Sequence, residues 1–233
     1  MTTSIERAGE EASFAPELFA FLADLGEHND REWFAANKGR YEAHVLEPAL
    51  AFIEDFGYRL QEISPHFAAD PRRSGGSLFR IHRDTRFAKD KSPYKTNTGM
   101  YFRHKRAKDV HAPGYYLHLA PGEVFAGGGI WHPDTPAVTR VRDAIVRDPE
   151  GWSRATQLRD GLELGGDTLK RMPSGYDKAH PHADDLKRKD YFAWVKLSEE
   201  VATAPGFLDR YTRVCLSVAL LMRFLCRSLE VEY

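Results

Sequence analysis

The first third of the chain places apolar residues at helical spacing. Between residues 14 and 25, phenylalanine and leucine recur every three or four positions. Pro16 suits the first turn of a helix, and Gly26 suits its end, because proline is tolerated where the backbone N–H is unpaired and glycine adopts the left-handed cap. The pattern predicts a helix that begins near Pro16 and ends before Gly26.

A second apolar segment with helical periodicity extends from residue 33 to residue 63. Asn29 and Glu32 precede it with the spacing of a capping box. Pro48 lies inside the segment, and proline removes a helical hydrogen bond and clashes with the preceding turn. We therefore expect two or three helices before Pro65.

From residue 78 onward the pattern changes to the alternation that is typical of half-buried strands. Short runs of this kind are found at residues 78–83, 99–104, 115–119 and 123–126. Pro121 and Gly122 have the composition of a tight turn between the last two runs. These runs predict an antiparallel meander of about four strands, and residues 191–197 predict a fifth.

The remaining segments predict further helices. Helical spacing is found from residue 135 to residue 146, from 152 to 158, and over the long amphipathic stretch 207–229, whereas residues 169–190 are rich in loop formers. The fold class that follows is α+β, with a central antiparallel sheet of about five strands and helical layers from the N- and C-terminal parts of the chain. We expect residues 1–12 to be a disordered tail and residues 13–233 to form a single domain.

Composition is that of an ordinary folded protein, but charge is unevenly distributed. Apolar residues make up 42% and charged residues 29% of the 233 positions, with a net charge of −1. Residues 1–71 hold 5 basic and 14 acidic side chains, whereas residues 72–108 hold 12 basic and 2 acidic ones. This contrast predicts either an anionic ligand for the basic block or an acidic helical layer packed beside it.

The cysteines and the longest apolar run indicate a cytoplasmic protein. Cys215 and Cys226 are eleven positions apart on one predicted helix, or ~16 Å, which is too far for a disulfide. The N-terminus lacks the features of a signal peptide. The apolar run at residues 214–222 is much shorter than the roughly 20 residues of a membrane helix, so we expect no membrane association.

The segment from Arg80 to Lys95 concentrates the polar chemistry of the chain. It forms a connection between predicted strands that is longer than an ordinary hairpin loop, and long loops in a folded domain are often functional. Guanidinium and ammonium groups that converge can bind phosphate or carboxylate. The expected ligand-binding residues are Arg80, Arg83, Arg86, Lys91 and Lys95, and the catalytic candidates are Asp84, Asp90 and Tyr94. A solvated or internally ion-paired loop has the same composition.

Other motifs carry weaker signals. We interpret Gly127–Gly129 as a tight bulge at a strand end, because no phosphate-loop ending follows it. His180 and His182, with nearby aspartates, have the side chains of a metal site, but the stretch fits an exposed loop equally well. No zinc spacing, nucleophile elbow or Cys–His pair is found in the sequence. We expect neither a cofactor nor a metal.

Together these motifs resemble the family called domain of unknown function 2461, conserved hypothetical proteins of bacteria and some fungi. The resemblance extends from about Phe14 to about Phe224. It rests on the motifs at residues 29–34, 80–87, 90–95, 113–116, 128–131, 169–171 and 175–177. The resemblance implies that the Arg80–Lys95 segment is a signature of the family. Because the family has no assigned activity, it implies no catalytic residue.

Three hypotheses for function follow from the basic segment. The first is a cytosolic protein that binds an anionic small ligand, phosphorylated or carboxylate, and it leaves open whether the protein is an enzyme. The second is a nucleic-acid-binding module that stacks bases on aromatic side chains, namely Phe87, Tyr94, Tyr101 and Phe102. The third is a structural or interaction protein in which the segment forms a buried network of salt bridges.

Overall fold

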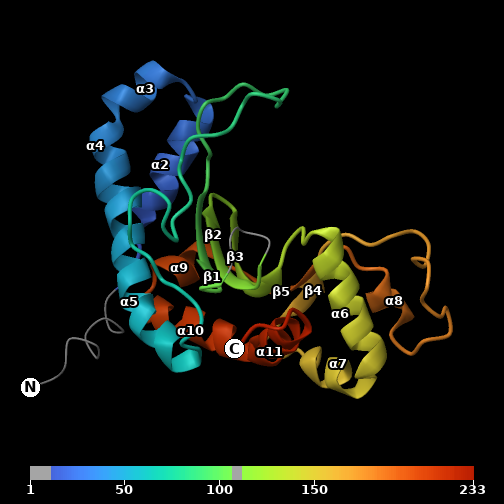
Figure 1. The fold of residues 1–233 in the computed structure, drawn as a ribbon. Coiled ribbons are helices and arrows are strands. Elements are labelled where there is room, and N and C mark those ends of the chain that lie inside the picture. Colours follow the sequence, from blue (N-terminus) through green and yellow to red (C-terminus); the bar gives the residue numbers. More distant parts are fainter. Residues whose placement is uncertain (1–11, 107–111) are drawn as a thin grey trace, which may run out of the picture.

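A five-stranded antiparallel sheet forms the centre of the computed structural model, which describes residues 12–106 and 112–233 (Figure 1). The strands are β1 (Thr98–Arg103), β2 (Gly114–Ala120), β3 (Glu123–Ile130), β4 (Glu163–Gly165) and β5 (Tyr191–Leu197). Their order in the sheet is β1-β2-β3-β5-β4, and each neighbouring pair is antiparallel. The predicted α+β class with a central sheet is confirmed. The predicted tail, apart from Ala12, lies outside the described residues.

The N-terminal helices stand at one side of the sheet (Figure 1). They are α2 (Pro16–Glu27), α3 (Arg31–Ala36), α4 (Lys38–Tyr41), the π-helical turn η1 (Glu42–Leu46) and α5 (Glu47–Ile63). Pro48 occupies the first turn of α5, directly after η1. The backbone stays in the helical region at Leu46 and Glu47, so the segment changes from π- to α-helix there and is not split into separate helices. The capping box at Asn29 is wrong: the side chain that caps α3 is that of Asp30, which accepts a hydrogen bond from the backbone N–H of Trp33 at 2.9 Å.

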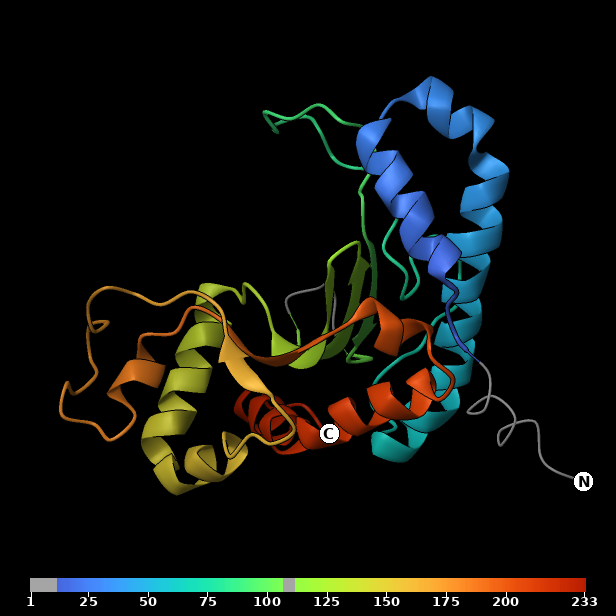
Figure 2. The ribbon, with the colours of Figure 1, turned by 180° about the vertical axis from the view of Figure 1, so that it is seen from behind.

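The C-terminal helices pack beneath the sheet, as Figures 1 and 2 both show. α10 (Phe207–Ser217) and α11 (Ala219–Ser228) replace the single long helix expected from the sequence. The break lies at Val218, where ψ is 0°. Beside the break, the hydroxyl of Ser217 lies 2.7 Å from a carboxylate oxygen of Asp160 and 2.9 Å from the carbonyl oxygen of Arg213. Serine bonds to the preceding turn bend helices. A short helix that the sequence pattern did not predict, α9 (Glu199–Thr203), precedes them.

The remaining helices form a lobe at the β4 end of the sheet (Figure 1). They are α6 (Thr135–Arg147), α7 (Pro149–Ala155) and α8 (Ala183–Leu186). The helix predicted at residues 152–158 begins and ends three residues earlier. Asp148 caps it, because its Oδ1 accepts from the backbone N–H of Gly151 at 2.8 Å. The predicted loop at residues 169–190 contains the single turn of α8.

The strand expected at residues 78–83 is wrong. This segment meets the chain that enters β1 at two isolated bridges, Leu78 with Met100 and His82 with Tyr94. The two bridges are four positions apart along one segment and six along the other, and Pro93 has no N–H to donate, so a regular ladder cannot form. We call residues 78–97 the arm. Its tip projects away from the rest of the molecule in both Figures 1 and 2.

The two faces of the sheet differ in what covers them. On β2, Tyr115, Leu117 and Leu119 are fully buried, whereas the alternate residues Tyr116 and His118 are only half-buried. A side chain at Gly128 would contact Val218 and Met222, which places α10 and α11 on the buried face. The opposite face is left open by these helices, and it carries the candidate site.

The bulge predicted at Gly127–Gly129 is wrong. These glycines lie inside β3, in continuous register with both β2 and β5. A Cβ at Gly127 would lie 2.0 Å from the carbonyl oxygen of Ala193, and one at Gly129, where φ is +146°, would lie 2.3 Å from the Cα of Phe192. Glycine is required here because β3 and β5 approach each other closely.

Within the described residues, no helix is both long and apolar enough to cross a membrane. Cys215 and Cys226 are free and buried, which confirms that they form no disulfide.

Candidate functional site

An aromatic cleft of about 580 Å³ lies on the open face of the sheet. β1, β2, β3 and β5 supply its floor, and the start of the arm supplies one wall. Most of its side chains are rings, and glycines of β3 leave space between them. The lining residues are Phe79, Tyr101, Gly114, Tyr116, His118, Glu123, Phe125, Gly127, Gly128, Gly129, Trp131, Gly166, Phe192, Ala193 and Trp194. We call this the aromatic cleft.

The rings of the cleft touch one another in a continuous chain across the strands. Phe79 lies 6.0 Å from Tyr116, Tyr116 lies 5.8 Å from Phe125, and Phe125 lies 5.6 Å from Trp194, each measured between ring centroids. Strand alternation produces this arrangement, since residues two apart on one strand and opposite on the next share a face. A connected aromatic surface of this kind binds planar rings and the apolar faces of sugars.

His118 is the titratable group on this surface with the most defined contacts. Its ring stacks on Phe125 at 4.5 Å, and its Nδ1 lies 3.1 Å from the hydroxyl of Tyr116. Its Nε2 lies 3.9 Å from a carboxylate oxygen of Glu123. Burial lowers the pKa of His118, and the Glu123 carboxylate opposes this effect. Burial also raises the pKa of Tyr116 to about 12, so its hydroxyl keeps its proton at neutral pH and shares a hydrogen bond with Nδ1 of His118.

Lys95 lies at the edge of the aromatic cleft. Its ammonium is 5.3 Å from the centroid of Phe79, which is itself a lining residue. Burial lowers the pKa of Lys95, and the nearby positive charge of Arg80 lowers it further. Among the residues that the structure describes, no carboxylate lies within 4 Å of either cation. Arg80 also lowers the pKa of Asp84, so of these two described cations only Lys95 combines a neighbouring cation with no nearby carboxylate. Such an arrangement favours a bound anion.

The other predicted ligand-binding residues point into the arm itself. Arg83 pairs with Asp90, and Arg86 forms a two-bond pair with Asp84, with Nε–Oδ1 at 3.0 Å and Nη2–Oδ2 at 2.7 Å. Lys91 donates to the backbone carbonyl of Thr85 at 2.9 Å. The structure therefore divides the five predicted cations. Lys95 lies at the edge of the cleft, and Arg83, Arg86 and Lys91 bind groups at the tip of the arm. Arg80 acts electrostatically on both Lys95 and Asp84.

The catalytic candidates do not line the aromatic cleft. Asp84 and Asp90 are exposed at the tip of the arm. Hydrogen bonds from Arg86 lower the pKa of Asp84, and hydrogen bonds from Ser92 and then Arg83 lower the pKa of Asp90. Tyr94 is buried and stacks on Phe34 at 4.1 Å. Backbone groups of Tyr94 also exchange two hydrogen bonds of 3.0 Å with the side chain of Asn29. These contacts make Tyr94 part of the base of the arm, and the catalytic roles stay predictions.

The side chains proposed to stack on bases do not share a surface. Phe102 and Tyr94 are buried in the core, at 0% and 6% exposure, and cannot reach a ligand. Phe87 is 94% exposed at the tip of the arm, and Tyr101 lies in the aromatic cleft. The salt bridges of the arm are also at the surface, with the Asp90 side chain 59% exposed, so they do not form a buried network.

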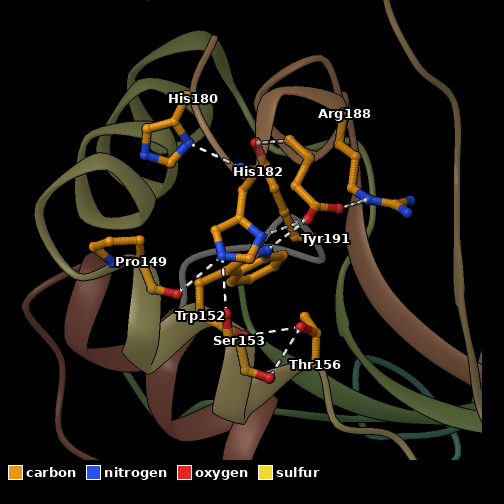
Figure 3. Close-up of polar contacts among 9 residues, drawn as sticks. Pro149, Trp152, Ser153, Thr156, His180, His182, Arg188 and Tyr191 are labelled. Atoms are coloured by element: carbon orange, nitrogen blue, oxygen red, sulfur yellow. Dashed lines mark hydrogen bonds and ion pairs between the residues drawn. The ribbon is translucent and has the colours of Figure 1, made fainter. Parts of the chain in front are cut away.

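His180 and His182 lie in the lobe, where His182 joins α7 to the segment that enters α8 (Figure 3). Its Nε2 lies 2.9 Å from the hydroxyl of Ser153 and 3.0 Å from the carbonyl oxygen of Pro149. Among residues 12–106 and 112–233, no three His, Cys, Asp or Glu side chains lie close enough to hold a metal together.

Ser153, His182 and Asp185 follow one another in the order of a catalytic triad, with Nε2 of His182 facing the serine and Nδ1 facing the aspartate. Their hydrogen bonds, however, do not support triad chemistry. A hydrogen bond from Nε2–H to the carbonyl of Pro149 prevents that nitrogen from accepting the serine proton. Asp185 instead accepts from the indole N–H of Trp152 at 2.8 Å and from Arg188 Nε at 2.9 Å (Figure 3). The cluster joins α7 to α8 rather than activating a nucleophile.

Sequence reasoning missed the aromatic cleft. The sequence does contain the alternation of rings along single strands. Tyr116 and His118 are two residues apart on β2, and Phe192 and Trp194 are two residues apart on β5. What the pattern did not contain was the register that aligns these strands, or the approach of Phe79 from the arm.

Comparison with known proteins agrees with the motifs quoted above. A search of the curated proteins finds no match. The family described as "Conserved hypothetical protein (DUF2461)" matches residues 17–224, which is most of the chain and includes the arm, the sheet and the helices beneath it. The chain therefore belongs to the DUF2461 family of conserved hypothetical proteins.

Proposed function

We propose that the protein binds an anionic small molecule that carries a planar ring. The ring lies on the aromatic cleft, and the anionic group, a phosphate or a carboxylate, lies at Lys95 and Arg80. One observation carries the proposal: Phe79 lines the cleft and at the same time lies 5.3 Å beneath the ammonium of Lys95. The aromatic surface and the cation therefore form one continuous site.

The size and chemistry of the aromatic cleft support a small ligand. Its volume of about 580 Å³ falls in the range of roughly 300–1,000 Å³ that is usual for small-molecule sites. Sites of this class combine an apolar lining with a few polar groups that fix orientation. Here those groups are His118 and Glu123 within the lining, with Lys95 at the edge.

Intrinsic fluorescence offers a direct test, because Trp131 and Trp194 both line the aromatic cleft. Ring-bearing phosphates and carboxylates are titrated into the protein, each beside its uncharged counterpart and at two salt concentrations. We expect saturable changes in emission for the anionic members. Tighter binding at low salt identifies the electrostatic contribution.

Two substitutions of the same kind separate the cleft from the arm tip. Lys95→Met keeps the apolar stem over Phe79 but removes the charge, so affinity falls about tenfold or more, as expected for a lost charged hydrogen bond. Arg86→Met removes a cation that is bound to Asp84 and leaves affinity unchanged. Equal affinity of Lys95→Met and wild type, or equal losses in both variants, would show the proposal to be wrong.

A further inference from the structure

A second pocket, of about 510 Å³, lies in the lobe around α8. It is lined by Lys170, Arg171, Met172, Lys178, Ala183, Asp184 and Lys187, and it shares no lining residue with the aromatic cleft. In Figure 1 α8 lies at the opposite end of the molecule from the N-terminal helices. We call this the cationic pocket.

The lining of the cationic pocket carries a strong excess of positive charge. Four of its seven residues are basic, and one is acidic. The acidic residue, Asp184, is paired with Lys187 at 2.5 Å, and this hydrogen bond lowers the pKa of its carboxyl. In the part of the chain that the structure describes, no carboxylate lies within 4 Å of Lys170, Arg171 or Lys178.

Three unpaired positive charges around one concavity repel each other, and a bound anion relieves that repulsion. A phosphate suits this pocket better than a single carboxylate, because its charge at neutral pH approaches −2 and its oxygens accept from several donors at once. Arg171 adds the planar fork that binds two phosphate oxygens together. The cavity is also large enough for the rest of a small molecule.

The backbone that carries these cations is held in place. Leu169 N–H donates to the carbonyl of Lys187 at 2.7 Å, and Lys189 N–H donates to the carbonyl of Asp167 at 2.8 Å. These bonds fix the two sides of the loop next to each other. At the outer part of the loop, the hydroxyl of Tyr176 donates to Asp143 on α6 at 2.8 Å. The lysine side chains are flexible, but their starting points are preorganised.

We propose that the cationic pocket binds the phosphate group of a small molecule. This site is independent of the aromatic cleft, since neither its residues nor its ligand chemistry depend on Lys95. A second anion site, at the end of the molecule opposite the N-terminal helices (Figure 1), would let the protein bind two ligands at the same time.

Calorimetric titration of the intact protein with pyrophosphate tests this proposal. Wild type is expected to bind with saturation and one-to-one stoichiometry at low salt. Arg171→Glu should weaken that binding at least tenfold. Lys196→Glu, which makes the same charge change at an exposed position of β5 outside both pockets, should change it little. Circular dichroism and the melting temperature verify that both variants are folded.

A substitution that should increase the affinity for pyrophosphate makes the test stronger. Asp184→Asn removes the carboxylate and releases Lys187, so pyrophosphate should bind severalfold more tightly. The proposal is overturned by absence of saturable binding, by equal losses in Arg171→Glu and Lys196→Glu, or by loss of binding in Lys95→Met. The last result would place pyrophosphate at the aromatic cleft. If Lys95→Met binds pyrophosphate as wild type does, and no ring-bearing ligand is found for the aromatic cleft, then only the proposed function is wrong.

Discussion

Asp84 and Arg86, two residues apart at the tip of the arm, form a surface ion pair. The pKa of the Asp84 carboxyl reports on this pair. Hydrogen bonds from the side chain and backbone of Arg86 lower the pKa of Asp84 from 3.8 to about 2. Between these values the unfolded chain binds a proton that the folded chain does not. The pair therefore contributes to stability above about pH 4, and its contribution is lost as the pH falls toward 2.

An NMR titration of Asp84 checks this prediction. We expect a pKa of about 2 in wild type and a return toward the ordinary value in Arg86→Met. Because both side chains are exposed, the contribution of the pair to stability is small, and the same variant should melt only slightly below wild type. An ordinary pKa for Asp84 in wild type would mean that the pair is not maintained in solution.

Substitution of glycine by alanine should have opposite effects on stability at Gly127 and at Gly39. A Cβ at Gly127 would lie 2.0 Å from the carbonyl oxygen of Ala193, so alanine forces β3 and β5 apart. We expect a loss of about 1–3 kcal/mol in the free energy of unfolding. Gly39 is in a helix with no atom within 4 Å of the added Cβ, and alanine there should stabilise by up to about 1 kcal/mol. Denaturant unfolding of both variants measures the contrast, and equal effects would contradict it.

At the scale of elements, Asn29 holds the arm to the N-terminal helices. Its side chain accepts from the backbone N–H of Tyr94 and donates to the carbonyl of Tyr94, both at 3.0 Å. The side chain of Asn29 is engaged in this long-range clamp, and Asp30, one residue later, occupies the N-cap position of α3.

Asn29→Ala leaves both backbone groups of Tyr94 unpaired in a half-buried setting. We expect a cost of about 1–3 kcal/mol and faster hydrogen exchange of the Tyr94 amide. Asn29→Asp keeps the acceptor and should preserve the protection of that amide better than alanine does. Unchanged exchange in Asn29→Ala would show that stacking of Tyr94 on Phe34 is sufficient to hold the arm.

At the scale of the whole molecule, the two cysteines report on global unfolding. Both are fully buried, and burial raises the pKa of Cys226 to about 12 and that of Cys215 even further. The thiolate is the reactive form, and neither solvent nor reagent reaches these thiols in the folded chain.

We therefore expect no reaction of the native protein with an aromatic disulfide reagent, and two reactive thiols per chain in denaturant. Gly127→Ala should react faster than wild type in native buffer, because its unfolded population is larger. Rapid reaction of one thiol in native wild type would indicate local opening of α10 or α11, and it would contradict the prediction.

The uneven charge of the sequence is only partly neutralised by folding. Arg73 at the base of the arm pairs with Glu47 of α5, but the carboxylates paired with cations of the arm come from the arm itself, among the described residues. Within residues 12–106 and 112–233, no carboxylate of the acidic helices is paired with Lys95. Folding of this part of the chain therefore leaves the positive charge of Lys95 without a carboxylate partner.

Elements with local signals could be predicted from the amino-acid sequence alone. Periodicity of 3.6 residues, prolines in first turns and alternation of period two located most helices and the strands β1, β2, β3 and β5, because these signals depend on neighbours along the chain. Other features depend on contacts between segments that are far apart in the sequence. The failed strand at residues 78–83, the break at Val218 and the meeting of Phe79 with Lys95 and Tyr116 depend on which distant segments pair and in what register. A linear pattern does not contain that information, since pairing is selected by the packing of the whole core.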